Sequence, residues 1–110
     1  MACNGHYMMI LTTCADKESA KRLAEVLVRT RLAACAQLLP IESIYLWKGE
    51  VCEENETMLL LKTKTVLKDK LMDAIKKNHS YEVPEFIHLP ITGGSPEYLA
   101  WIDECVDRPG

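Results

Sequence analysis

Two segments of the chain carry large apolar side chains at every position of an expected strand. They are residues 7–11 (Tyr-Met-Met-Ile-Leu) and residues 58–61 (Met-Leu-Leu-Leu). Successive side chains of a strand point to opposite faces, so a sheet built from these segments is apolar on both faces. A chain of 110 residues has the length of one domain only. We therefore expect another copy of the chain to cover the second face, because soluble monomers avoid exposed apolar patches.

Four strand patterns and three helical patterns follow one another along the chain. The strand patterns cover residues 6–13, 35–47, 56–65 and 85–91, and the amphipathic helical patterns cover residues 17–29, 66–77 and 96–105. Asp16, Thr65 and Ser95 stand at the expected N-caps, and residues 48–50 are expected at the tip of a long hairpin. The order β-α-β-β-α-β with a closing helix is the split βαβ arrangement. It predicts an α+β fold with two helices on one face of an antiparallel sheet, in a single domain spanning residues 1–110.

The charge balance argues against a polyanionic partner. The chain has 13 basic and 16 acidic residues, a formal net charge of −3. This sign removes the attraction that supplies most non-specific affinity for nucleic acid or anionic membranes. The longest uncharged stretches are about half the roughly 20 residues that a membrane-spanning helix needs, so we expect no nucleic-acid binding and no membrane insertion.

The cysteines predict a reducing environment. Five cysteines are spread along the chain without a Cys-x-x-Cys pair, so neither a zinc knuckle nor a redox dithiol is expected. The first residues carry no Lys or Arg, which is unlike a secretory signal. We expect reduced thiols and a cytoplasmic location.

Five segments closely resemble the CutA divalent-cation tolerance family. They are residues 31–35 (Arg-Leu-Ala-Ala-Cys), 43–50 (Ser-Ile-Tyr-Leu-Trp-Lys-Gly-Glu), 62–63 (Lys-Thr), 79–85 (His-Ser-Tyr-Glu-Val-Pro-Glu) and 98–102 (Tyr-Leu-Ala-Trp-Ile). The resemblance runs in order from about Met9 to Ile102. It implies a ferredoxin-like homotrimer, similar in architecture to PII signalling proteins, that is linked to divalent-metal tolerance and binds copper.

The resemblance also implies where copper would bind. Copper suits sulfur and imidazole ligands, so His79, Cys14 and a nearby acid such as Glu85 are the predicted metal ligands. The cysteine that some bacterial members carry in the first strand is replaced by Thr12, and Cys14 lies two residues further on, on the same face of the strand. The alternative for His79 is structural, as an imidazole that caps carbonyls at the end of the second helix.

A second group of residues is predicted to line a cleft between subunits. Tyr45, Trp47 and Tyr81 are the aromatic candidates, although aromatic side chains on a hairpin also anchor subunit contacts. Lys62 interrupts an apolar central strand, and an unpaired buried charge is costly. Lys62 is therefore expected either to pair with Glu85 or another carboxylate, or to face the cleft and meet an anionic ligand.

These observations favour binding over catalysis. The sequence contains no identifiable nucleophile–base pair, paired carboxylates or glycine-rich phosphate loop. We predict a trimeric, PII-like binding or signalling protein for divalent metals, without enzymatic activity. Two alternatives are an assembly or anchoring partner for another protein and an acylphosphatase-like enzyme. The enzyme would need an anion cradle with an arginine after the first strand, and residues 12–16 (Thr-Thr-Cys-Ala-Asp) contain neither glycine nor arginine.

Overall fold

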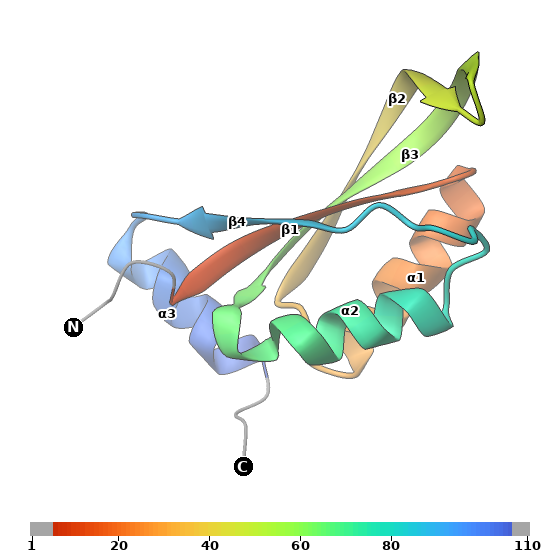
Figure 1. The fold of residues 1–110 in the computed structure, drawn as a ribbon. Helices are drawn as coiled ribbons and strands as arrows, with labels where there is room; N and C mark the ends of the chain where they lie inside the picture. Colours follow the sequence, from red (N-terminus) through yellow and green to blue (C-terminus); the bar gives the residue numbers. More distant parts are fainter. Residues whose placement is uncertain (1–5, 107–110) are drawn as a thin grey trace.

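The computed structural model describes residues 6–106 and confirms the predicted order of elements (Figure 1). The sheet has four strands, and three α-helices and one 3-10 turn complete the fold. In chain order these are β1 (Tyr7–Cys14), α1 (Lys17–Arg29), β2 (Cys35–Trp47), β3 (Glu50–Lys64), η1 (Thr65–Leu67), α2 (Lys68–Lys77), β4 (Ile87–Ile91) and α3 (Pro96–Cys105). No helix within residues 6–106 is long and apolar enough to cross a membrane.

All neighbouring strands of the sheet are antiparallel, in the order β2-β3-β1-β4. Ile10 pairs with Leu61 and Met9 pairs with Lys62. Cross-strand partners share a face, so β1 and β3 carry apolar side chains on both faces of the sheet, as the sequence predicts. The edge position of β2 explains how Pro40 is tolerated, since the missing N–H of proline removes no bond of an inner ladder.

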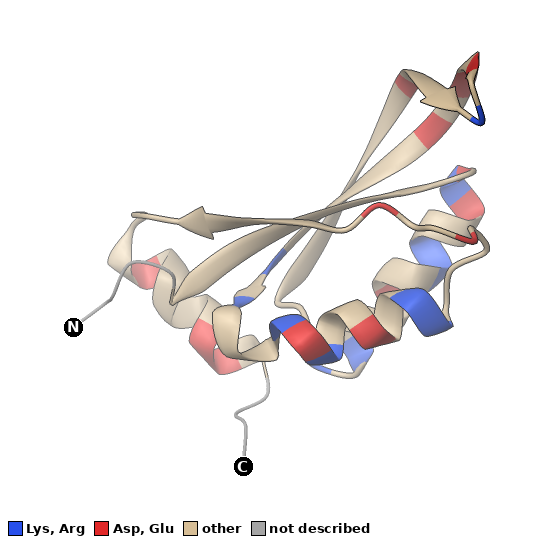
Figure 2. Ribbon diagram, in the orientation of Figure 1, with Lys and Arg blue, Asp and Glu red and all other residues tan. Residues whose placement is uncertain are grey.

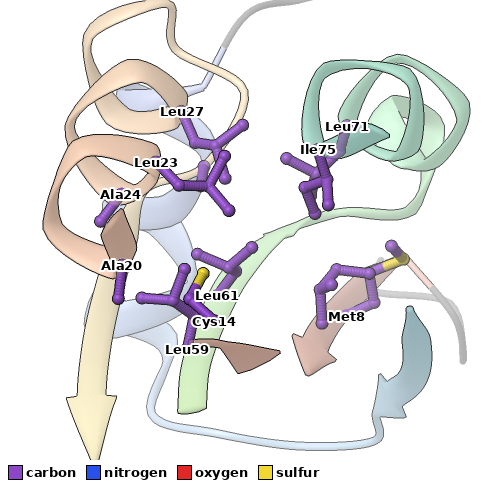
Figure 3. Packing of buried hydrophobic residues seen from close by; sticks show 12 residues of the cluster. Met8, Cys14, Ala20, Leu23, Ala24, Leu27, Leu59, Leu61, Leu71 and Ile75 are labelled. Atoms are coloured by element: carbon purple, nitrogen blue, oxygen red, sulfur yellow. The ribbon is translucent and has the colours of Figure 1, made fainter. Parts of the chain in front are cut away.

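The main core lies between one face of the sheet and helices α1 and α2. Figure 3 shows Leu23 and Leu27 of α1 and Leu71 and Ile75 of α2 converging over β1 and β3. These side chains are almost entirely buried. Asp16 fixes the start of α1, because its carboxylate accepts the Ser19 N–H at 2.8 Å.

Helix α3 lies on the opposite face and covers only one end of it. Ile102 packs with Tyr7 in a second apolar cluster, and the Tyr7 hydroxyl donates to the Asp103 carboxylate. Lys64 forms an ion pair with the same carboxylate at 3.1 Å. The hydrogen bond to Asp103, together with burial, raises the pKa of Tyr7 to about 12. These polar contacts attach α3 to the ends of β1 and β3.

The rest of this second face remains apolar and open to solvent. Leu39, Ile87 and Leu89 are 49%, 46% and 41% exposed, and they lie on the face that carries Met9 and Leu60. The expected second apolar face is therefore present, and within this chain only its α3 end is covered.

Strands β2 and β3 extend beyond the rest of the sheet as a hairpin arm (Figure 1). They pair without interruption from Cys35–Lys62 to Trp47–Glu50, and the arm gives the molecule a long axis of 47 Å. Lys48 and Gly49 make the turn with φ values of 51° and 82°. A left-handed backbone is typical of two-residue hairpin turns, and glycine adopts it without the steric cost that other residues meet.

Several sequence-based boundaries are wrong, most by one or two residues. Strand β3 begins at Glu50 rather than residue 56, because it pairs with β2 up to the turn. Strand β4 begins at Ile87 rather than residue 85, since the preceding residues turn toward the hairpin arm. Thr65 is not an N-cap, because it opens the 3-10 turn that precedes α2.

Candidate functional site

A cleft of about 880 Å³ lies between the hairpin arm and the segment that joins α2 to β4. The arm contributes Tyr45 and Trp47, and the joining segment contributes Tyr81. Three of the four predicted cleft residues are thus brought together within one chain.

The cleft is strongly acidic. Its glutamates come from β2, β3 and the joining segment, and they are Glu42, Glu54, Glu56, Glu82 and Glu85. No Lys, Arg or His is among the described residues that line it. Figure 2 shows acidic positions on the hairpin arm and on the segment between α2 and β4, whereas basic positions of β3 lie at the opposite end of that strand. The local charge therefore favours a cation.

Hydrogen bonds with tyrosines orient two of these carboxylates. The Tyr81 hydroxyl donates to Glu56 Oε2 at 2.7 Å, and the Tyr45 hydroxyl hydrogen-bonds to Glu54. The hydrogen bond to Glu54 raises the pKa of Tyr45 to about 12. Burial and the hydrogen bond to Glu56 raise the pKa of Tyr81 above its ordinary range. Both hydroxyls therefore stay protonated near neutral pH and keep the carboxylates in place as acceptors.

Glu85 is held in an unfavourable electrostatic environment. Burial, and after it the nearby charge of Glu56, raises the pKa of Glu85. A cation beside the two carboxylates would remove this penalty, because an opposite charge favours the ionised form.

His79 fixes the joining segment beneath the cleft. Its Nδ1 accepts the Tyr81 backbone N–H at 3.0 Å, so Nε2 carries the ring proton of the neutral form and donates to the Thr13 carbonyl oxygen at 2.6 Å. This carbonyl belongs to β1 rather than to a helix, so His79 does not cap the end of α2. The imidazole instead connects β1 to the segment that carries Tyr81.

The structure brings together two of the three predicted copper ligands. Cys14 Sγ lies 3.8 Å from His79 Nε2, whereas Glu85 lines the cleft with Glu56. Within residues 6–106 no group of three or more His, Cys, Asp or Glu side chains could hold a metal ion. The predicted three-ligand set is therefore not assembled.

The Cys14–His79 pair does not fit a resident metal ion. Thiols bind metals as thiolates, but burial, with the charges of Asp16 and Glu56, raises the pKa of Cys14 to about 11. Both imidazole nitrogens of His79 already have partners. The family's cysteine position gives no alternative ligand, because Thr12 is completely buried.

Lys62 does not lie in this cleft. Its Nζ donates to Gln37 Oε1 at 2.7 Å and sits 5.6 Å from the centre of the Tyr98 ring. The expected pairing of Lys62 with Glu85 is wrong. Glu85 lies near Glu56, and Glu56 is six residues, or roughly 20 Å, away from Lys62 along β3.

The sequence reasoning missed the carboxylates of the arm. Glu54 and Glu56 lie two residues apart on β3, a spacing that places both side chains on one face of a strand. That spacing was the available signal, but it does not show that residues 80–85 fold back toward the arm.

Together, the strand order and the helix placement define a ferredoxin-like α+β protein with an acidic cleft beside an extended hairpin. The family model described as "CutA1 divalent ion tolerance protein" matches residues 8–105. The chain therefore belongs to the CutA1 divalent ion tolerance family.

Individual relatives agree with this assignment. The divalent-cation tolerance protein CutA of Thermus thermophilus is 45% identical over 97 residues, which cover 87% of this chain and 94% of that protein. The chloroplastic protein CutA of Arabidopsis thaliana is 43% identical over 96 residues, which cover 86% of this chain and 53% of that protein. The chain thus spans about half the length of this plant relative.

The fold is also similar to solved structures. The crystal structure of CutA1 from Oryza sativa matches with a TM-score of 0.92 at 39% identity, covering 96% of this chain and 98% of that one. The CutA1 structure from Thermus thermophilus matches with a TM-score of 0.89 at 43% identity, covering 92% and 99%. The predicted family and fold are confirmed.

Proposed function

We propose that this chain is a non-catalytic binding protein with a role in divalent-cation tolerance. In this proposal it acts as a PII-like signalling homotrimer and binds its cation at the acidic cleft. The observation that carries the proposal is the composition of the cleft, in which five carboxylates and three aromatic rings meet without a basic side chain among the described residues. Such a lining attracts cations and repels anions.

The cleft supports a loosely held cation rather than a closed coordination site. Carboxylate oxygens suit hard divalent cations, which often keep part of their water shell. This agrees with the lack of a ready group of three ligands in the described part of the chain. Copper as the cation stays a prediction from the family resemblance, although the predicted ligands His79, Cys14 and Glu85 are not all brought together among the described residues.

The open sheet face supports assembly with other copies of the chain, and the number of three subunits comes from the family resemblance. Leu39, Ile87 and Leu89 are partly exposed on this face, and burying side chains of this size contributes roughly 1.5–3 kcal/mol each. Cys14, Cys35, Cys52 and Cys105 are unpaired thiols, which supports the proposed reducing, cytoplasmic location.

A titration with matched variants tests the cation site. Cu²⁺, Zn²⁺ and Mg²⁺ are titrated calorimetrically into wild-type protein and into Glu56→Gln, Glu85→Gln, Glu18→Gln and His79→Gln, and Trp47 fluorescence is followed in parallel. Glu18 is an exposed control on α1 with the same change of charge. We expect Glu56→Gln and Glu85→Gln to weaken binding of at least one cation by roughly tenfold or more.

Two results would contradict the proposal. One is an affinity in the Glu56→Gln and Glu85→Gln variants equal to that of Glu18→Gln. The other is a loss of binding in His79→Gln alone, which would place the cation at the Cys14–His79 pair. Light scattering of the native protein separately tests assembly, and a mass of one chain would exclude the trimer.

A further inference from the structure

Lys62 is a cation without an acidic partner on the second face of the sheet. Its contacts within residues 6–106 are the Gln37 carbonyl oxygen at 2.7 Å and the Tyr98 ring at 5.6 Å, both neutral. Lys64, two residues further along the same strand face, has the Asp103 carboxylate at 3.1 Å. The fold thus neutralises one lysine of this face and leaves the other uncompensated.

The groups around Lys62 are mainly hydrogen-bond donors. We call Cys35, Gln37, Lys62 and Tyr98 the Lys62 cluster. Cys35 is the cross-strand partner of Lys62, and its Sγ lies 3.7 Å from the Tyr98 hydroxyl. The oxygen of the Gln37 amide already accepts from Lys62, so its NH₂ group remains available as a donor.

Protonation keeps this donor character near neutral pH. Burial and the contact with Cys35 raise the pKa of the Tyr98 hydroxyl. The cluster therefore presents an ammonium, an amide NH₂ and one further proton from the Tyr98–Cys35 pair, in which either atom can be the donor, and these groups come from β2, β3 and α3. A negatively charged oxygen is the chemical complement of such a set.

The position of the cluster increases the need for an anion. It lies where α3 meets the open part of the apolar face, next to Leu60 and Met9. In the proposed assembly this face is covered, and an ammonium that loses water without gaining an anion is strongly unfavourable.

We infer that the Lys62 cluster binds a small oxyanion, namely the carboxylate or phosphate group of a small molecule. The inference rests on the proposed function only in one respect, namely that another copy of the chain would cover the site. The four residues of the cluster themselves come from one chain. The cluster is distinct from the acidic cleft in charge and in place, and the two are roughly 20 Å apart along β3. This protein would then bind anions and cations at separate sites.

The experiment titrates inorganic phosphate and citrate at constant ionic strength, with sodium chloride as the reference salt. Binding is followed by calorimetry and by the shift of the thermal midpoint, for wild type, Lys62→Met, Lys62→Arg and Lys21→Met. Lys21 is an exposed lysine of α1 and provides the matched control. Tyr98→Phe and Gln37→Leu are included in case Lys62→Met does not fold.

We expect saturable binding of phosphate or citrate to the wild type and a loss of roughly tenfold or more in Lys62→Met, Tyr98→Phe or Gln37→Leu. Lys62→Arg should keep most of the affinity, and Lys21→Met all of it. Equal binding in Lys62→Met and Lys21→Met would overturn the inference, as would the lack of saturable binding to the wild type.

Light scattering on the same samples separates this inference from the proposed function. If the wild type binds neither anion and Lys62→Met dissociates into single chains, the partner of Lys62 is a carboxylate of another copy, and the inference is wrong. If the wild type itself is monomeric, the proposed trimer fails, while the anion titration still decides the role of the cluster.

Discussion

Thr12 and Thr63 allow a direct measurement of what a buried hydroxyl contributes to this sheet. Both side chains are completely buried on the helix-covered face. The Thr63 hydroxyl donates to the Leu32 carbonyl oxygen at 2.7 Å. The Thr12 hydroxyl has no hydrogen-bond partner among the described residues. The two threonines therefore differ in hydrogen bonding but share their burial.

Replacement of each threonine by valine should change stability in opposite directions. An unpaired buried hydroxyl costs about 1–3 kcal/mol, and valine has nearly the same shape. We expect Thr12→Val to raise the free energy of unfolding by about 1 kcal/mol or more. Thr63→Val loses a net hydrogen bond and leaves the Leu32 carbonyl without this donor, so it should lower that free energy by about 1–2 kcal/mol.

Guanidinium unfolding followed by tryptophan fluorescence measures both effects. All samples need the same protein concentration, because the apparent stability of an oligomer depends on it. An unchanged slope with a shifted midpoint would show that only stability has changed. A loss of stability in Thr12→Val equal to that in Thr63→Val would refute the reasoning, since it would mean that the Thr12 hydroxyl has a favourable interaction.

Three further changes test the charges and the turn. Tyr7 and Lys64 hold the pKa of Asp103 below its ordinary 3.8, so the stability that this carboxylate contributes is present at neutral pH and is lost as the pH falls through the lowered pKa. Asp103→Asn should therefore lower the free energy of unfolding by about 1 kcal/mol at pH 7. Urea unfolding should show that the difference between variant and wild type shrinks below pH 3.8, and a difference that grows there would contradict the assignment. The pKa of Glu85 is raised above its ordinary 4.5, so ionised Glu85 destabilises the fold. Glu85→Gln should therefore be more stable than wild type at pH 7, and this difference should disappear below pH 4.5. A variant that is less stable than wild type at pH 7 would be inconsistent with the raised pKa. Gly49 has a φ of 82° and no atom within 4 Å of an added Cβ. Gly49→Ala should therefore lower the stability of the hairpin by about 1 kcal/mol through backbone strain alone. This strain should appear as faster hydrogen exchange at the hairpin tip, and unchanged exchange would exclude it.

Local patterns were sufficient for most of the fold. The apolar periodicity of α1 and the alternation of β3 depend on neighbouring residues only, and the structure confirms both. The start of β4 was not predictable from such patterns. Residues 85 and 86 alternate like a strand, but the chain there turns toward the hairpin arm, and the pairing of β4 with β1 ends at Leu11–Ile87.

The position of α3 shows the same limit on a larger scale. The sequence predicts its Ser95 cap, and Ser95 does accept the Tyr98 N–H at 3.3 Å. The pattern of the helix does not indicate which face of the sheet it covers. That choice depends on Tyr7 and Lys64, which are more than 30 residues away in the chain and meet Asp103 only after folding.

The candidate site was predictable only in part for a related reason. Tyr45, Trp47 and Tyr81 were predicted to line a cleft between subunits, and the structure places them together in a cleft within one chain. The expected Lys62–Glu85 pair failed because the strand register decides the neighbours of Lys62. These are Met9 and Cys35 on the adjoining strands.

Helix α3 also limits how a neighbouring sheet can pack on the open face. Two sheets packed face to face lie about 10 Å apart, and a helix with its side chains is about as thick. Asp103 attaches α3 to one end of that face, so in the proposed trimer α3 would stop a second sheet from moving past that end. In that proposed assembly α3 would set the sideways alignment of adjacent copies, and variants that detach α3 should allow them to slide out of register.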